Sequence, residues 1–126
     1  MQLKFHIYFC DELGEKFFGE GPYRLLLGIQ ELGSLRAAAL QMGMAYTKAF
    51  ALIKRAEQEF GFPLTQKTIG GKGGGGSVLT MEARELLQRY NAYRFACAET
   101  VRALYQAHFA DFPAENHPNL RQEKGE

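Results

Sequence analysis

A glycine-rich loop with one lysine is the stretch of this sequence whose residue types point most directly to chemistry. Six of the seven residues from Gly70 to Gly76 are glycine, and Lys72 stands among them. Such backbone can wrap a nucleotide phosphate, link two domains, or approach another molecule closely at a hairpin tip. The elements on either side decide between these three possibilities.

The flanking residues favour the hairpin tip. A phosphate-binding P-loop needs Gly-Lys-Ser or Gly-Lys-Thr between a strand and a helix, but Gly73 follows Lys72. Residues 64–69 (LTQKTI) and 77–80 (SVLT) are both short strand candidates, so the strand-to-helix setting of a dinucleotide site is also missing. Both flanks have the pattern of packed segments, which argues against a linker. We therefore expect a hairpin with the glycine loop at its tip.

Other catalytic signatures are missing from the sequence. His6, His108 and His117 are scattered without a metal-ligand spacing, and no G-x-S-x-G motif or carboxylate pair stands out. We predict that the protein is not an enzyme, and we expect no cofactor and no metal. Cys10 and Cys97 have no metal-type spacing either, so we interpret them as small buried apolar residues in a reducing cytoplasm.

The distribution of charge says more than its total. The chain has 126 residues, enough for one domain, and a net charge of +1. Residues 34–80 carry six basic and two acidic side chains, net +4, whereas residues 1–33 are net −2 and residues 81–126 net −1. A basic middle third favours an anionic partner at one face. No apolar run approaches the ~20 residues of a membrane span, so we expect no membrane partner.

The elements before the loop are predicted from periodicity and end signals. Alternating apolar residues indicate a strand over residues 3–10, and a short strand can return at Lys16–Phe18. A helix opens at Gly21-Pro22 and ends at Gly33, which suits a C-terminal cap. Ser34 can cap a second helix over Leu35–Met42, which contains three consecutive alanines. A third helix is expected from about Ala45 to Phe60.

The second and third helices have the spacing of a helix-turn-helix. Ala39 is the small residue that lets one helix cross the other closely, and Gly43, four positions later, tolerates the positive φ of the turn. Apolar residues that can face inward surround both: Ala38, Met42, Met44, Ala49 and Leu52. With the hairpin behind it, the pattern predicts a winged helix-turn-helix, a mainly α fold with a small β wing.

A long helix follows the hairpin. Thr80 can cap a helix from Met81 to about Phe109, roughly 40 Å long at 1.5 Å per residue. Its apolar stripe is longer than one small domain covers. We expect one domain over residues 1–110 and a disordered polar tail over residues 111–126, which contains two prolines.

In a helix-turn-helix, the second helix enters the major groove of double-stranded DNA and presents its N-terminal residues to the bases. Here these are Ala45, Tyr46, Thr47 and Lys48, with Phe50 and Ala51 as further candidates. Positively charged or helix-capping residues outside this group would meet phosphates. The full predicted set of DNA contacts is Ser34, Arg36, Ala45, Tyr46, Thr47, Lys48, Lys54, Arg55, Lys67, Gly71, Lys72 and Gly73.

Ordinary structural roles are also open to three of these residues. Tyr46 can be an aromatic residue at the edge of the core. Arg55 can pair with Glu59 one helical turn later, and Arg36 can pair with a neighbouring helix.

Residues from about Leu3 to Tyr105 resemble the N-terminal DNA-binding domain of the molybdate-responsive ModE regulators, which are related to LysR-type winged helices. The resemblance rests on GPYRLLLGIQELGSLRAAALQMGMAYTKAF, EFGFPL and above all GGKGGGGSVLT. It implies a bacterial, homodimeric transcriptional regulator that binds an inverted repeat. It also implies a dimer interface formed by the long helix, about 81–109, with the first helix. The long-helix residues expected there are Leu87, Tyr90, Cys97, Val101 and Leu104.

Two departures from the family limit what the resemblance implies. The family commonly carries basic residues just after the tyrosine of the third helix, and this chain has Thr47 and then Lys48, so its operator preference can differ. ModE regulators also continue into molybdate-binding domains, and we expect none in this chain. A stand-alone regulator with another effector, a protein–protein interaction module, and a ligand or metal sensor at the dimer interface therefore stay open as alternatives.

Overall fold

The computed structural model describes residues 2–68 and 76–112. The chain divides into two compact units. The first spans residues 6–92, and the second combines residues 1–5 with residues 93–126, of which 2–5 and 93–112 are described.

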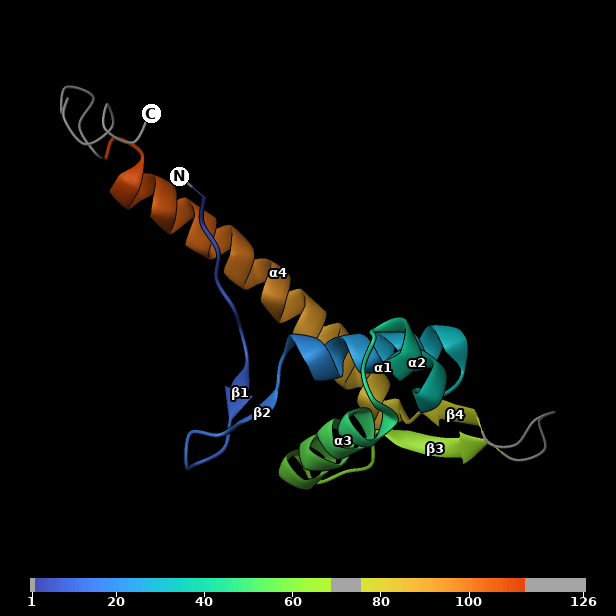
Figure 1. Ribbon diagram of the computed structural model, residues 1–126. Coiled ribbons are helices and arrows are strands. Elements are labelled where there is room, and N and C mark those ends of the chain that lie inside the picture. Colours follow the sequence, from blue (N-terminus) through green and yellow to red (C-terminus); the bar gives the residue numbers. More distant parts are fainter. Residues whose placement is uncertain (1, 69–75, 113–126) are drawn as a thin grey trace. The chain divides into compact units, whose positions relative to one another are not determined.

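The first two helices of the first unit are joined at a tight corner (Figure 1). Helix α1 (Glu20–Leu32) ends at Gly33, which has the left-handed φ of 78° that the predicted C-cap requires. Helix α2 (Leu35–Gln41) begins at once, because the Ser34 side chain accepts a hydrogen bond from the backbone N–H of Ala37 at 2.9 Å. The cap predicted for Ser34 is confirmed.

Small residues let α1 and α2 pack closely. Ala38 and Ala39 are buried, and a β-carbon added at Gly28 would lie only 2.8 Å from the β-carbon of Ala38. Gly43 then turns the chain with a φ of 64°, and helix α3 (Tyr46–Phe60) follows. Ala49, Ile53 and Ala56 are the buried residues of α3. The predicted helix-turn-helix is therefore present with its small residue and its turn in register.

A two-stranded antiparallel wing follows α3. Strand β3 (Thr65–Thr68) pairs with β4 (Gly76–Leu79), so that Thr65 faces Leu79 and Thr68 faces Gly76. The backbone N–H of Ser77 donates to the carbonyl oxygen of Gly33 at 2.8 Å and holds β4 against the corner between α1 and α2. These contacts hold the base of the wing beside the helix-turn-helix.

The N-terminal strand is much shorter than its alternating pattern predicts. Strand β1 covers only Phe9–Cys10 and pairs with β2 (Lys16–Phe18), whereas residues 2–8 form no strand. The prediction of a strand over residues 3–10 is wrong because β2 is three residues long and offers no further ladder partner. The returning strand at Lys16–Phe18 is confirmed.

An aromatic cluster ties this hairpin to the first turns of helix α4 (Met81–Phe109). Phe18 packs edge-on against Tyr90 with ring centroids 5.0 Å apart, and Phe9 meets the same ring at 5.8 Å. The Tyr90 hydroxyl donates to the carbonyl oxygen of Ile7 at 2.9 Å. Phe60, at the end of α3, contacts Phe18 at 5.4 Å, so that the cluster joins three parts of the unit.

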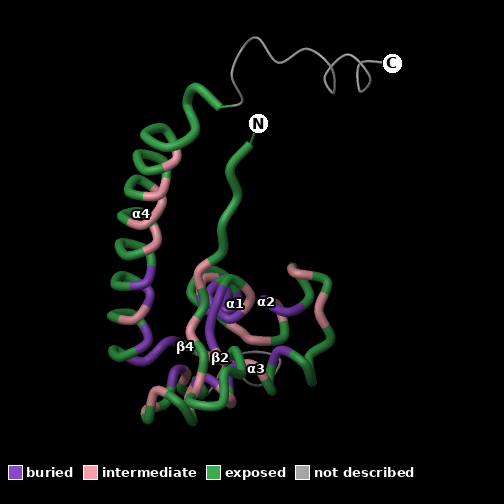
Figure 2. The backbone as a smooth tube through the Cα atoms, turned by 90° about the vertical axis from the view of Figure 1, so that its left-hand side faces the viewer, coloured by how far each residue is buried: buried purple, intermediate pink, exposed green. Residues whose placement is uncertain are grey.

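Buried positions on α4 are confined to its first part (Figure 2). Ala83, Leu87 and Tyr90 are buried there, and Thr80 caps the helix by accepting from the N–H of Ala83. Leu87 and Tyr90 were expected in a dimer interface. The core of their own chain covers both side chains, and their place in a dimer interface stays a prediction.

Candidate nucleic-acid interface

The outward face of α3 is the surface that the helix-turn-helix leaves open. Its buried residues lie on one side, and Ala45, Tyr46, Thr47 and Lys48 at its N-terminal end are all exposed. The exposed side chains of Thr47 and Lys48 form no hydrogen bond or ion pair with any residue that the structure describes. Both are therefore available to an external partner.

Two cations lie against aromatic rings on this face. The Arg36 guanidinium of α2 lies over the Tyr46 ring, 4.3 Å from its centroid. The Tyr46 and Phe50 rings are 6.2 Å apart, and the Lys54 ammonium lies 5.4 Å from the centroid of the Phe50 ring. The four side chains form a row that we call the cation–aromatic row: Arg36, Tyr46, Phe50 and Lys54. Cation–π contact restrains long basic side chains without consuming their charge.

The contacts in this row bear on two structural roles that the sequence left open, a core-edge role for Tyr46 and an ion pair for Arg36. Tyr46 is 38% exposed and is not a residue of the core cluster. Among the described residues, Arg36 contacts the Tyr46 ring and pairs with no acidic side chain. Lys54 additionally pairs with Glu57 at 3.2 Å, and the Glu57 carboxylate accepts from the N–H of Leu64 at 2.7 Å. Lys54 therefore already forms an ion pair with a carboxylate of its own helix.

Arg55 has a structural role. Its guanidinium bonds to Asp11 of the N-terminal hairpin and to Glu59, and Glu15 lies 3.9 Å away. The bond to Glu59 contributes most to raising the pKa of Arg55 above its usual value. The pKa of Asp11 is lowered, most of all by the hydrogen bond from the backbone N–H of Glu15. The side-chain hydrogen bond from Arg55 lowers it further. Three carboxylates therefore lie around Arg55, and its charge is engaged within its own chain.

The remaining predicted contacts divide between described and undescribed residues. Ser34 is half-buried and its oxygen caps α2, while Lys67 is exposed on β3 opposite Ser77. Gly71, Lys72 and Gly73, at the predicted wing tip, lie outside the described residues. Most of the predicted tail, residues 113–126, also lies outside them.

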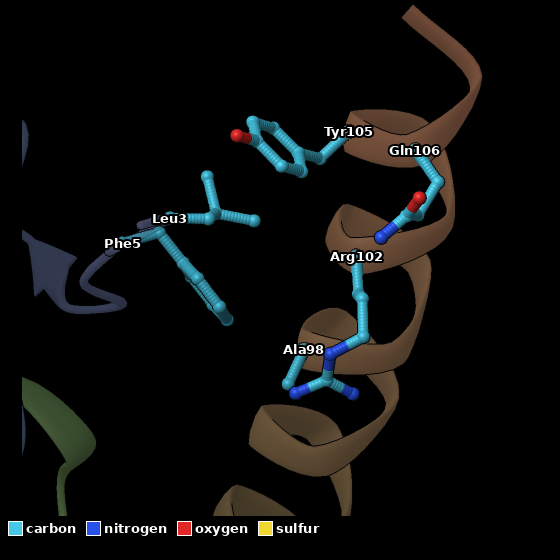
Figure 3. A pocket seen from close by; sticks show the side chains of 6 residues that line it. All are labelled: Leu3, Phe5, Ala98, Arg102, Tyr105 and Gln106. Carbon is cyan, nitrogen blue, oxygen red and sulfur yellow. The ribbon is translucent and has the colours of Figure 1, made fainter. Parts of the chain in front are cut away.

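A second surface belongs to the unit formed by residues 2–5 and 93–112. Val101 and Cys97 are partly exposed there, and Leu104 is 54% exposed. In Figure 3, Leu3 and Phe5 of the N-terminal segment extend toward α4, and Tyr105 points toward Leu3. These side chains, with Ala98, Arg102 and Gln106, line a hollow of about 250 Å³. Three of the five predicted dimer residues thus remain on an accessible surface.

The cysteines differ from their predicted environment. Cys10 is exposed and Cys97 is half-buried, so neither is the buried apolar residue that the sequence predicted. The side-chain hydrogen bond with Cys97 is the main cause that raises the pKa of Tyr93.

Within the described residues, no three His, Cys, Asp or Glu side chains gather as metal ligands. No helix of that part of the chain is long and apolar enough to cross a bilayer.

Sequence reasoning missed the residues that hold the interface in place. Gly28 sets the distance between α1 and α2, and Asp11 fixes Arg55 across 44 positions of sequence. A glycine inside a predicted helix is a visible signal of close packing. The Asp11–Arg55 pair leaves no such signal, because nothing local in the sequence brings the hairpin to α3.

Comparison with protein families agrees with this geometry. Residues 23–84 match the family model described as "Bacterial regulatory helix-turn-helix protein, lysR family". The matched range runs from α1 through α3 and the wing into α4. A solved LysR family transcriptional regulator superposes with a TM-score of 0.52 at 20% identity, over 70% of this chain and 29% of that one. This likeness shows the winged helix-turn-helix fold.

Curated relatives confirm the resemblance predicted from the motifs. The DNA-binding transcriptional dual regulator ModE of Escherichia coli (strain K12) is 37% identical over 82 residues, 64% of this chain and 31% of that protein. The molybdenum-pterin-binding protein MopB of Rhodobacter capsulatus is 32% identical over 91 residues, 72% of this chain and 33% of that protein. The chain spans about a third of the length of these two relatives.

Proposed function

We propose that the protein is a sequence-specific, DNA-binding regulator of transcription, because residues 23–84 match the lysR family of regulatory helix-turn-helix proteins. The observation that carries this proposal is the exposed N-terminal end of α3, where Thr47 and Lys48 have no partner among the described residues. In this fold that end of the helix enters the major groove. Lys48 would donate to guanine or phosphate oxygens, and Thr47 would contact a base edge.

Residues around α3 would hold the DNA backbone. Arg36 and Lys54 keep their charge at two ends of the cation–aromatic row, and both would face phosphates beside the groove. Ser34 would add a contact at the corner before α2. Lys67 on β3 is exposed and would meet the flanking backbone. The contacts proposed for Gly71, Lys72 and Gly73 rest on the sequence alone.

We propose a homodimer that joins through the second part of α4. Cys97, Val101 and Leu104 recur at steps of four and three residues, which places them on one face of a helix. Their exposure, together with that of Leu3 and Phe5, leaves an apolar surface that a second copy would cover. Two copies would present two α3 helices to an inverted repeat.

A link to molybdenum is proposed from the relatives' names. MopB is named a molybdenum-pterin-binding protein, and a Herbaspirillum seropedicae relative is named a molybdenum transport protein. We propose that the genes bound by this chain belong to molybdenum metabolism. Immunoprecipitation of the protein with its bound chromosomal DNA would test this. Bound fragments with no connection to molybdenum transport or molybdoenzymes would refute this part of the proposal.

The proposed DNA contact can be tested by selection followed by titration. Duplexes that bind the protein are selected from a random pool, and their affinity is then measured by fluorescence anisotropy at several salt concentrations. We expect the logarithm of the binding constant to fall linearly with the logarithm of salt, by about 0.9 for each phosphate contacted. Affinity that does not respond to salt would contradict DNA binding and favour a protein partner for this surface.

Lys48 is the residue whose loss should matter most for specific binding. We expect Lys48→Ala to weaken binding to the selected duplex by about 1–3 kcal/mol and to unrelated DNA by less. Lys16→Ala removes the same charge from an exposed residue of β2, outside the α3 face and the proposed dimer surface, and serves as the control. Equal losses on both duplexes would make Lys48 a phosphate contact instead.

A further inference from the structure

The two aromatic rings of the cation–aromatic row lie on the surface of the first unit. Tyr46 is 38% exposed and Phe50 is 45% exposed, and the two rings contact each other one helical turn apart. Neither ring is among the residues of the core cluster or those packed against it. Among the described residues, the core therefore does not cover these rings, which leaves them open to an external surface.

The position of Phe50 on α3 favours DNA as the external partner of the two rings. Phe50 follows the buried Ala49 and precedes Ala51, which is exposed one turn after Thr47. The N-terminal end of α3 thus presents a threonine methyl, an alanine methyl and a phenyl ring on its accessible sides. Residues 46–51 (YTKAFA) contain no Asn or Gln, the residues that read adenine with paired hydrogen bonds, and Lys48 is their one residue that can donate to guanine.

Apolar groups in the major groove have one chemical partner among the bases. Thymine carries a 5-methyl group there, and alanine, threonine methyl and phenylalanine side chains contact it. The charges beside the rings fit the same occupant, because Arg36 and Lys54 lie over the Tyr46 and Phe50 rings and can meet phosphates on either side. A protein partner would use the rings but would not require a cation at each end of the row.

We infer that Phe50, with Ala51 beside it, reads thymine methyl groups and is a specificity-determining residue of this domain. The inference rests on the proposed DNA binding and adds which base the helix selects. Tyr46 is a positioning residue in this scheme, since its ring supports both Phe50 and Arg36. Each methyl contact should be worth about fourfold in affinity, the effect of burying one such group.

Substitution of deoxyuridine for thymidine tests the inference, because it removes only the methyl group. The probe is the duplex selected from a random pool by the wild-type protein, with each thymine in turn replaced by uracil. We expect wild-type affinity to fall about fourfold at one or two positions in each half-site. Phe50→Ala should bind the thymine duplex less tightly and lose this discrimination at those positions.

Matched variants separate the contact from general damage. Phe95→Ala removes another exposed phenylalanine, which lies on α4 and is 68% exposed, and should keep the wild-type discrimination. Phe50→Leu keeps an apolar group and should retain part of it, and a thermal melt confirms that each variant folds. Full discrimination by Phe50→Ala, or wild-type affinity insensitive to uracil at every position, would overturn the inference while DNA binding stands. Failure of the wild type to select any duplex would remove the proposed function itself.

Discussion

Lys48 and Arg55 lie on the same helix and carry the same charge, yet their surroundings give them different roles. Lys48 is exposed and unpaired among the described residues, whereas Arg55 is held by Asp11 and Glu59. The i,i+4 spacing of Arg55 and Glu59 made that pair foreseeable from the sequence. Asp11 could not be foreseen, because it reaches Arg55 only after the β1–β2 hairpin has folded against α3.

The Asp11–Arg55 pair makes part of the protein's stability depend on pH. Because the folded state lowers the pKa of Asp11, the ionised carboxylate stabilises the fold above its ordinary pKa of 3.8, and this stabilisation disappears as pH falls through the lower folded value. We expect Asp11→Asn to be less stable than wild type at neutral pH and the difference to vanish in strong acid.

Chemical denaturation at a series of pH values measures this difference. Glu12→Gln removes a neighbouring exposed carboxylate and is the matched control, for which a much smaller difference is expected. A stability gap between Asp11→Asn and wild type that persisted unchanged into strong acid would show that charge is not its source.

At the scale of elements, end signals in the sequence were more reliable than periodicity. Gly33, Ser34, Gly43 and Thr80 mark the ends of helices and do so in the structure, because each acts through its own backbone or a neighbour's N–H. The alternation in residues 3–10 predicted a strand that is mostly absent. A strand needs a partner, and the length of that partner is not encoded in the alternating segment.

The apolar stripe of the last helix shows the same limit. Leu87 and Cys97 fit one stripe in the sequence, but the first is buried in the core and the second is partly exposed. Periodicity identifies the face of a helix that avoids water. Whether the cover comes from the same chain or from a second copy depends on tertiary packing, here on the aromatic cluster around Tyr90.

The contact between α1 and α2 should be sensitive to a single methyl group. We expect Gly28→Ala to lower the free energy of unfolding by about 1–3 kcal/mol, because its β-carbon would lie 2.8 Å from that of Ala38 and the helices would have to separate. Urea unfolding followed by circular dichroism measures the change. Gly21→Ala, in the same helix with nothing within 4 Å, should be neutral or stabilising by up to ~1 kcal/mol. Equal effects of the two substitutions would mean that Gly28 is not a packing constraint.

At the scale of the whole molecule, the proposed dimer determines how many α3 helices meet DNA together. Leu104→Glu places a charge on the apolar face of α4, and we expect it to shift the protein from about twice the 14.2 kDa of one chain to a single chain. Light scattering after size exclusion at micromolar concentration measures the mass. Ala103→Glu adds the same charge to a neighbouring exposed position off that face and should remain dimeric. A dimeric Leu104→Glu protein would place the interface elsewhere.

The measurement that tests DNA recognition most directly is a dimethyl sulfate footprint, which reports access to guanine N7 in the major groove, on a duplex selected by the wild-type protein. We expect two protected major-groove patches about one helical turn apart, roughly 10 base pairs between centres, symmetric about the middle of an inverted repeat. Leu104→Glu should protect one half-site at a time and with lower affinity. A tightly bound duplex that carries guanines in both half-sites, none of them protected, would contradict recognition by α3.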